Sequence, residues 1–208
     1  MTDDLLLVSA AALKGATSPD SAYSRMGDDV PLDEICWAIA AAQEAVAGRL
    51  GFDPLAALYT EHVAADVFPH THYPQARPVG TVETEGATTD GRRITLAEAA
   101  GTVVYTAGWR GAHHVLPSES AGEGEVDVRT LPGLSGLTAL PPLVPADVRS
   151  VIVDLALVGL DRRRQNLLGG RKNTVEIGDD TYRTEGYRAS AESEILGGLS
   201  VHHRIARV

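Results

Sequence analysis

Apolar residues recur at intervals of three or four in two long stretches of the chain, and this spacing predicts two amphipathic helices. The first stretch runs from Pro31 to Gly51, and its apolar positions are Ile35, Ile39, Ala42, Val46 and Leu50. Pro31 suits a first helical turn, the acidic pair Asp33 and Glu34 lies where the helix dipole favours anions, and Gly51 fits the C-terminal cap. We expect the apolar face of this helix to pack on a core.

The second stretch begins at Pro145 and has the same spacing. Its apolar positions are Val148, Val151, Ile152, Leu155 and Val158 or Gly159. Asp147 lies in the first turn, and three arginines (residues 162–164) lie in the last turn, where cations are favoured. The pair Gly169-Gly170 is expected to end this helix.

Residues 3 to about 14 also have helical spacing, with Leu6 and Leu13 on one side. The following residues, GATSPDSAYSRMGDDV, are rich in Gly, Ser, Pro and Asp, which disfavour regular structure. Residues 1–30 are therefore predicted to be an N-terminal helix and a linker.

The middle of the chain alternates with a period of two and predicts strands. The segments VGTVETEG (79–86) and TVVYTAG (102–108) are strand candidates, and TTDGRR (88–93) carries the Asp-Gly signature of a tight hairpin turn. A long run of Gly, Ser, Glu and Pro follows, and it predicts a long loop over about 110–143.

The last part, residues 169–208, contains two short strand-like pieces and an apolar, basic end. It has too few large apolar residues for a core of its own, so we expect it to be an extended arm. The predicted fold class is mainly α with a small antiparallel β element (α+β). Its core would be a helical bundle with β-hairpins.

Composition and charge narrow the class of protein. The 208 residues are 44% hydrophobic and 22% charged, which is typical of a globular chain. The net charge is −10; residues 162–208 carry nine Lys/Arg and six Asp/Glu, a local +3, so residues 1–161 carry −13. This balance argues against a general nucleic-acid binder. The basic tail is either a docking segment for a partner or neighbouring subunit, or a solvated tail.

No apolar run is long enough to span a bilayer, and the acidic start MTDDLLLVSAAALKG differs from an export signal. We therefore expect no membrane association. The one cysteine, Cys36, leaves no intramolecular disulfide and no Cys-based zinc site, and it fits a reducing compartment. Its apolar neighbours predict a buried structural thiol.

Seven histidines are the most obvious candidates for chemistry. His70 and His72 would lie on one face of a strand and could bind zinc with one further ligand, but they lie between two prolines and outside any HExxH motif. The adjacent pairs His113-His114 and His202-His203 would point to opposite sides of a strand, so we interpret them as polar surface residues. Glu83, Glu85, Asp90 and Glu98 are likewise interpreted as solvated surface.

Motifs for catalysis and phosphate binding are also missing from the sequence. GLSGL (133–137) lacks the spacing of a nucleophile elbow, and neither a Walker motif nor a GxGxxG opening a helix is found. We expect no catalytic residue, no cofactor and no metal. A small metal-dependent enzyme that uses His70 and His72 is the alternative from another class.

The order of these elements carries a resemblance. A helix ending at Leu50-Gly51 precedes strands, the strand end reads YTAGW (105–109), and VPADVR (144–149) opens the next helix. This combination resembles the head-to-tail connector (adaptor) proteins of tailed bacteriophages and related gene-transfer particles. The match covers roughly residues 31–168, and its structural motif residues are Tyr105, Gly108, Trp109, Pro145 and Asp147.

Two features depart from that family. The spacer from Arg110 to Leu143 is longer than the family's usual short link, which indicates an inserted loop. The tail after Gly170 matches no motif of a family tail.

The resemblance implies a non-enzymatic ring subunit in the virion neck, made in the host cytoplasm. Family members typically assemble as twelve copies beneath the portal, join it to the stopper or another tail-completion protein, and leave a channel for DNA. An acidic body would let DNA slide without sequence-specific binding. Residues 31–168 would form the connector core.

Residues 169–208 would form an arm that binds the portal or another partner. The residues expected to carry that contact are Arg183, Arg188, Leu199, His202, Arg204, Ile205 and Arg207. A nearer alternative is another ring protein of the same particle, a stopper or a tail terminator. Those proteins are mainly β, so the two predicted helices weigh against them.

Overall fold

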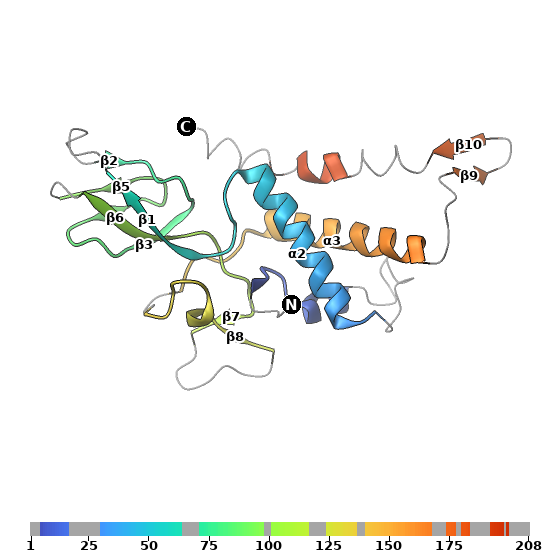
Figure 1. The fold of residues 1–208 in the computed structure, drawn as a ribbon, viewed down its shortest axis with the longest axis horizontal. Coiled ribbons are helices and arrows are strands. Elements are labelled where there is room, and N and C mark those ends of the chain that lie inside the picture. Colours follow the sequence, from blue (N-terminus) through green and yellow to red (C-terminus); the bar gives the residue numbers. More distant parts are fainter. Residues whose placement is uncertain are drawn as a thin grey trace.

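The computed structural model describes residues 5–16, 30–63, 71–97, 101–116, 124–136, 140–167, 174–177, 180–183, 192–197 and 199. Two long helices lie across each other toward one end of the molecule, and short strands form the other end (Figure 1). We call the helices and the residues packed with them the helical part. Strands β1 to β6 with their described connections are the β part.

The first long helix, α2, spans Leu32–Leu50, and its bounds and buried face confirm the prediction. The chain enters it at Pro31 and leaves it at Gly51, whose left-handed backbone (φ 80°) lets its N–H donate to the Ala47 carbonyl. All five apolar positions of the predicted stripe are buried, and so is Cys36. The helix therefore presents one apolar face to the core.

The second long helix, α3, spans Ala146–Leu167 and packs along α2. Val148 and Ile152 are fully buried, while Leu155 is only half-buried. The buried face continues through Ala156 and Leu160. The predicted stop at residues 169–170 lies outside the described residues.

A short N-terminal segment completes the helical part. Helix α1 spans Ala10–Ala16, so it begins later than the predicted residue 3. The Ser9 hydroxyl accepts a hydrogen bond from the Ala12 N–H (3.1 Å), which fixes the start of the helix there. The preceding chain is tied to α2, because Gln43 accepts from the Leu7 N–H (2.9 Å) and donates to the Leu5 carbonyl (3.2 Å).

The main sheet of the β part is three-stranded and antiparallel. Its order is β1 (Ala57–His62), β6 (Thr102–Ala107) and β3 (Val79–Val82). The two strands predicted at 79–86 and 102–108 are thereby confirmed. Strand β1 was missed, because its inward positions include Glu61 while Leu58 faces outward, so its apolar residues do not alternate.

A second small sheet has the order β2 (Thr71–His72), β5 (Ile94–Thr95) and β4 (Thr88–Thr89). The β4–β5 hairpin turns at the predicted Asp90-Gly91 pair, and Gly91 has a φ of 86°. The two sheets share an apolar cluster that has no residue in common with the helical core. Its buried members are Ala76, Val79, Ile94, Leu96, Val103, Tyr105 and Ala107.

The predicted loop over 110–143 contains regular structure where it is described. Strands β7 (His114–Val115) and β8 (Val126–Asp127) pair in parallel, and a 3₁₀ turn follows at Val128–Thr130. Val128, Leu131 and Leu134 are buried in the helical core. This segment is therefore packed on the body of the protein.

The arm contains a hairpin of β9 (Thr174–Ile177) and β10 (Asp180–Arg183), which confirms the two strand-like pieces. Residues 192–197 are helical, and Leu199 follows them. No helix within the described ranges is long and apolar enough to cross a bilayer.

The predicted helical bundle core is wrong. The described residues form ten strands in four small sheets beside α1, α2 and α3, so the fold is mixed α/β. The apolar stripes of the two long helices dominate the sequence pattern. By contrast, most of these strands span only two to four residues, too few to give a clear period of two.

Candidate functional site

The residues that carry the family resemblance form the junction between the two parts. Strand β6 ends at Ala107, and the chain then passes from one core to the other within two residues. Tyr105 is buried in the β cluster, whereas Trp109 is buried in the helical core beside Phe52, with ring centroids 5.8 Å apart. The junction thus anchors one aromatic ring in each core.

Gly108 makes this passage possible. Its φ is 97°, and a Cβ at this position would lie 2.6 Å from the Leu55 carbonyl oxygen. Backbone hydrogen bonds hold both sides of it: the Gly108 N–H donates to Pro78 (3.0 Å) and the Trp109 N–H to Pro54 (2.8 Å). The Ala56 N–H donates in turn to the Trp109 carbonyl (2.9 Å). A residue with a side chain would force this backbone apart.

The junction continues directly to the start of α3. The Arg110 N–H donates to the Pro142 carbonyl, and the Val144 N–H donates back to the Arg110 carbonyl, both at 2.9 Å. The Arg110 Nε also donates to the Pro141 carbonyl (3.1 Å). The two ends of the spacer, Arg110 and Leu143, therefore lie side by side at the junction.

Pro145 and Asp147 occupy the predicted positions at the start of α3. The Pro145 carbonyl accepts from the Arg149 N–H (2.9 Å), and the Asp147 carboxylate accepts from the Val148 N–H (2.9 Å). An acid in the first turn also suits the helix dipole. These residues act on helix geometry rather than on a ligand.

The interpretation of His113 and His114 as surface residues is wrong. His114 is fully buried, and its Nδ1 accepts a hydrogen bond from the Gly111 N–H (2.9 Å). The two rings lie 4.2 Å apart. A tight turn replaces the extended strand that would separate them, and Gly111 packs too closely on Leu7 for any side chain. This pair belongs to the packing between the spacer and the N-terminal segment.

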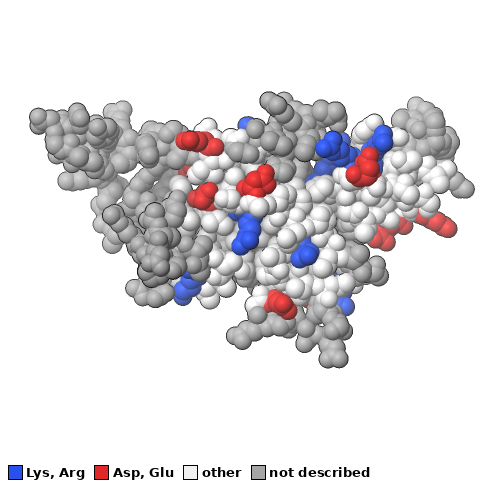
Figure 2. All heavy atoms as spheres, turned by 180° about the vertical axis from the view of Figure 1, so that it is seen from behind, with Lys and Arg blue, Asp and Glu red and all other residues white. Residues whose placement is uncertain are grey.

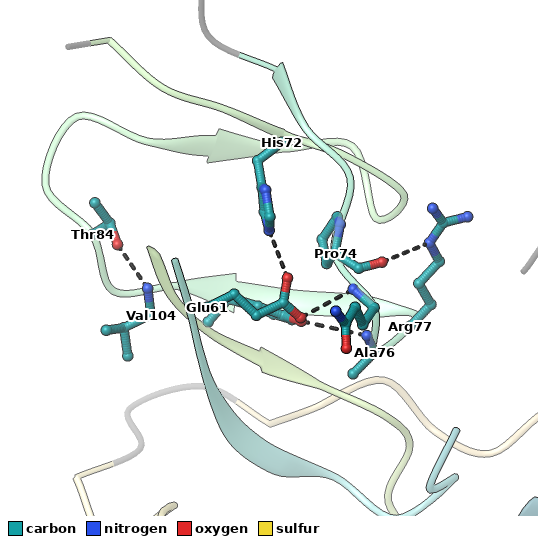
Figure 3. A network of polar contacts seen from close by, with 9 residues as sticks. Glu61, His72, Pro74, Ala76, Arg77, Thr84 and Val104 are labelled. Atoms are coloured by element: carbon teal, nitrogen blue, oxygen red, sulfur yellow. Dashed lines mark hydrogen bonds and ion pairs between the residues drawn. The ribbon is translucent and has the colours of Figure 1, made fainter. Parts of the chain in front are cut away.

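A second group of polar residues is centred on Glu61 of β1 (Figure 3). One carboxylate oxygen lies 2.7 Å from Nε2 of His72, and the other accepts from the Gln75 N–H (3.0 Å) and from the Tyr105 hydroxyl. The same hydroxyl accepts from the Ala76 N–H (3.4 Å). A single side chain therefore connects β1, β2, β6 and the segment after β2.

The Glu61 and His72 side chains are only 16% and 15% exposed. Burial alone raises the pKa of Glu61, but hydrogen bonds from Tyr105, Gln75 and His72 outweigh it and hold this pKa below its usual value. Burial, strengthened by the hydrogen bond to Glu61, raises the pKa of Tyr105 well above its usual value. Glu61 is thus a charged acceptor and Tyr105 a protonated donor at neutral pH.

This arrangement is a structural cross-link. Both carboxylate oxygens are occupied by donors of the protein, and Nε2 of His72, which could bind a metal, faces Glu61. His70, the other proposed ligand, lies outside the described residues. In the part of the chain that the structure describes, no three His, Cys, Asp or Glu side chains gather as a metal site.

A groove of about 430 Å³ lies between α2, α3 and residues 192–197. Trp37 lines it and is 49% exposed, and the Arg163 guanidinium lies 5.0 Å from the centre of the Trp37 ring. Nε of Arg163 is also 3.4 Å from a Glu34 carboxylate oxygen. Sequence reasoning misses Trp37, although a tryptophan off the apolar stripe of α2 is a signal that could have identified it.

The arm residues are only partly described. Leu199 is fully buried in the helical core, which corrects its assignment to a partner-binding surface. Its burial reflects the N–H donated to Leu196, which turns the chain back onto the helices. Arg183 ends β10. The other proposed contacts, Arg188, His202, Arg204, Ile205 and Arg207, lie outside the described residues, as does Glu98.

The visible charges form no single-sign patch on the face shown in Figure 2. Acidic and basic side chains are scattered there among uncharged residues. Glu83, Glu85 and Asp90 are exposed, as predicted.

No family model matches this chain, and a search of the curated proteins finds no match.

Proposed function

We propose that this protein is a head-to-tail adaptor, a structural ring subunit of the virion neck that joins the portal to the stopper or tail. The observation that carries the proposal is the closed spacer. In the family that the sequence resembles, a strand leads through a short link into a core helix. Here hydrogen bonds between Arg110 and residues 142–144 bring the end of β6 next to the start of α3, although a long spacer lies between them in the chain. The long spacer, which is the main departure from the family, therefore leaves the order of strand and helix in space unchanged.

A structural role also agrees with the polar residues. The Glu61 carboxylate, which joins β1, β2, β6 and the segment after β2, binds groups of the protein itself. We therefore propose no catalytic residue and no cofactor. The acidic balance of residues 1–161 suits a channel wall that repels DNA phosphates, so that the genome passes without specific binding.

In this proposal the subunits form a closed ring, with twelve copies as in the family that the sequence resembles. A ring needs two different surfaces on each subunit, one for each neighbour. The separate helical and β parts give the chain an elongated form with distinct ends (Figure 1). Such a shape supports contacts to both neighbours and to the proteins above and below.

Electron microscopy of the purified full-length chain tests this proposal. We expect rings with a central opening, formed alone or on addition of portal-bearing capsids. A chain that remains monomeric under both conditions would contradict it.

A second candidate is another ring protein of the neck, a stopper or a tail terminator. The larger β content of the structure favours it. Pull-down with purified portal separates the two, because an adaptor binds the portal directly. Zinc or iron at one atom per chain in the purified protein would instead support the metal-dependent enzyme.

The proposed partner-binding role of the arm can be tested by a truncation that removes no residue of the buried core. Removing residues 200–208 retains the buried Leu199 but deletes His202, Arg204, Ile205 and Arg207. We expect a folded protein that attaches poorly to portal-bearing capsids. A truncation after Gly198 is the matched comparison, since it also removes Leu199 and should destabilise the fold. Normal attachment by the 200–208 truncation would contradict a partner-binding role for these residues.

A further inference from the structure

We infer that Glu61 is a latch that fastens the small β2–β5–β4 sheet to the main β1–β6–β3 sheet. Releasing it would open residues 71–76 and 88–96, which form the small sheet and its ends, while the helical part stays folded. This inference concerns a conformational device and does not depend on the proposed function.

The small sheet is weakly held by its own strand pairing. Strand β2 pairs with β5 through only two residues, and β4 pairs with β5 through two. Ladders of this length are not stable alone and need packing or other contacts. The attachment to the main sheet therefore decides whether the small sheet stays in place.

Three kinds of contact provide that attachment. Ile94 and Leu96 are buried in the β cluster, and the Val79 N–H donates to the Gly91 carbonyl (3.0 Å). The third contact is Glu61, which binds His72 of β2 and the Gln75 N–H next to it. In Figure 3 the His72 ring points toward the Glu61 carboxylate, and a dashed line joins the two.

Loss of the Glu61 carboxylate would affect several donors at once. His72, the Gln75 N–H and the Tyr105 hydroxyl would each lose their charged acceptor, and the contacts of His72 and Tyr105 are partly buried. Leaving such donors unsatisfied costs more than an ordinary hydrogen bond contributes. The effect of this one side chain should therefore exceed that of an exposed acid.

The groups that face Glu61 determine when the latch opens. His72 faces it from β2 and Tyr105 from β6, while Tyr59 of β1 stacks on Tyr105 at 5.8 Å and has Asp53 nearby. Arg77 turns away and donates through Nε to the Pro74 carbonyl (Figure 3).

Protonation of Glu61 itself releases the latch, and this happens in acid.

The helical part does not depend on this contact. Its apolar core shares no residue with the β cluster, and both tryptophans of the chain, Trp37 and Trp109, lie on its side of the junction. Trp fluorescence therefore reports on the helical part, and the exchange of amides 71–76 and 88–96 reports on the small sheet.

Hydrogen–deuterium exchange of the full-length Glu61→Gln variant at neutral pH tests the inference. We expect amides in 71–76 and 88–96 to exchange about tenfold faster or more, while those of 32–50 and 146–160 keep their rates. Glu85→Gln is the matched control, because it makes the same change at an exposed site of the β part and should alter neither region. Tyr105→Phe removes one donor and should give a smaller acceleration in the same segment.

Unchanged exchange of 71–76 and 88–96 in Glu61→Gln would overturn the latch. If the amide exchange rates rose equally in both parts, or if the Trp fluorescence spectrum changed, the two parts would not be independent.

Discussion

The helical part and the β part of this molecule are held together in different ways. In the helical part, α2 and α3 bury continuous apolar stripes, and Ile39, Val148 and Ile152 are fully buried. The β part has a smaller apolar cluster and relies on a charged carboxylate, Glu61, to join its sheets. The first should therefore tolerate changes of pH and of surface charge that loosen the second.

The two parts meet at the junction formed by Gly108 and Trp109. Trp109 fills a place in the helical core, and Gly108 allows the backbone to leave the sheet next to Leu55. Changes at the junction should affect both parts, whereas changes elsewhere should affect one. The following experiments use this difference, from the largest expected effect to the smallest.

Trp109→Ala should have the largest effect. Removing this buried ring and its contact with Phe52 should lower the free energy of unfolding by about 3–5 kcal/mol. Denaturant unfolding followed by circular dichroism measures the loss. Trp37→Ala is the control, because the Trp37 ring is half exposed and its removal should cost less than about 1.5 kcal/mol. Equal losses for the two variants would contradict the assignment of Trp109 to the core.

Gly108→Ala should come next, with a loss of about 2 kcal/mol or more from a positive φ and a close backbone contact. Both Trp fluorescence and amide exchange in the β part should show it. Gly101→Ala is a suitable comparison at the other end of β6, since a Cβ there meets nothing within 4 Å. If Gly108→Ala disturbed only one part, the junction would not couple them.

Acid should loosen the β part before the helical part. The folded pKa of Glu61 lies below its usual value, so its stabilisation is complete above that value and is lost as the pH falls through the folded pKa. NMR signals of residues 71–76 and 88–96 should therefore broaden or shift at a higher pH than Trp fluorescence changes. If the NMR signals and the Trp fluorescence changed at the same pH, the β part would not be more sensitive to acid than the helical part.

Arg163→Ala should have the smallest effect. Arg163 is half exposed, and its contacts with Trp37 and Glu34 are of the kind that contribute about 1 kcal/mol or less. Thermal unfolding of this variant should stay close to that of the unchanged protein. A loss as large as that of Gly108→Ala would mean that the helical part also depends on charge.

The sequence predicts the helical part well and the β part less well, for physical reasons. The stripe of α2 and the cap at Gly51 are local features, so both were found. The turn at residues 88–93 was found for the same reason. Strand β1 and its Glu61 were missed, because an acid on an inward position breaks the alternation on which the prediction depends.

Long-range contacts explain the other differences. The closure of the spacer depends on backbone hydrogen bonds of Arg110 with residues 142–144, and no sequence spacing specifies them. The burial of His114 depends on a turn at Gly111. The sequence LYTEH did contain a usable signal for the inward position of Glu61. Glu61 follows Tyr59 by two residues, so in a strand both side chains lie on the same face.

The most direct test of the proposed function is a cryo-electron microscopy reconstruction of the neck of tailed particles that contain this protein. The proposal predicts a ring of copies directly beneath the portal, with α2 and α3 fitting the density and the DNA channel passing through its centre. Density for the protein only on the capsid surface or along the tail, with no ring of its copies beneath the portal, would contradict it.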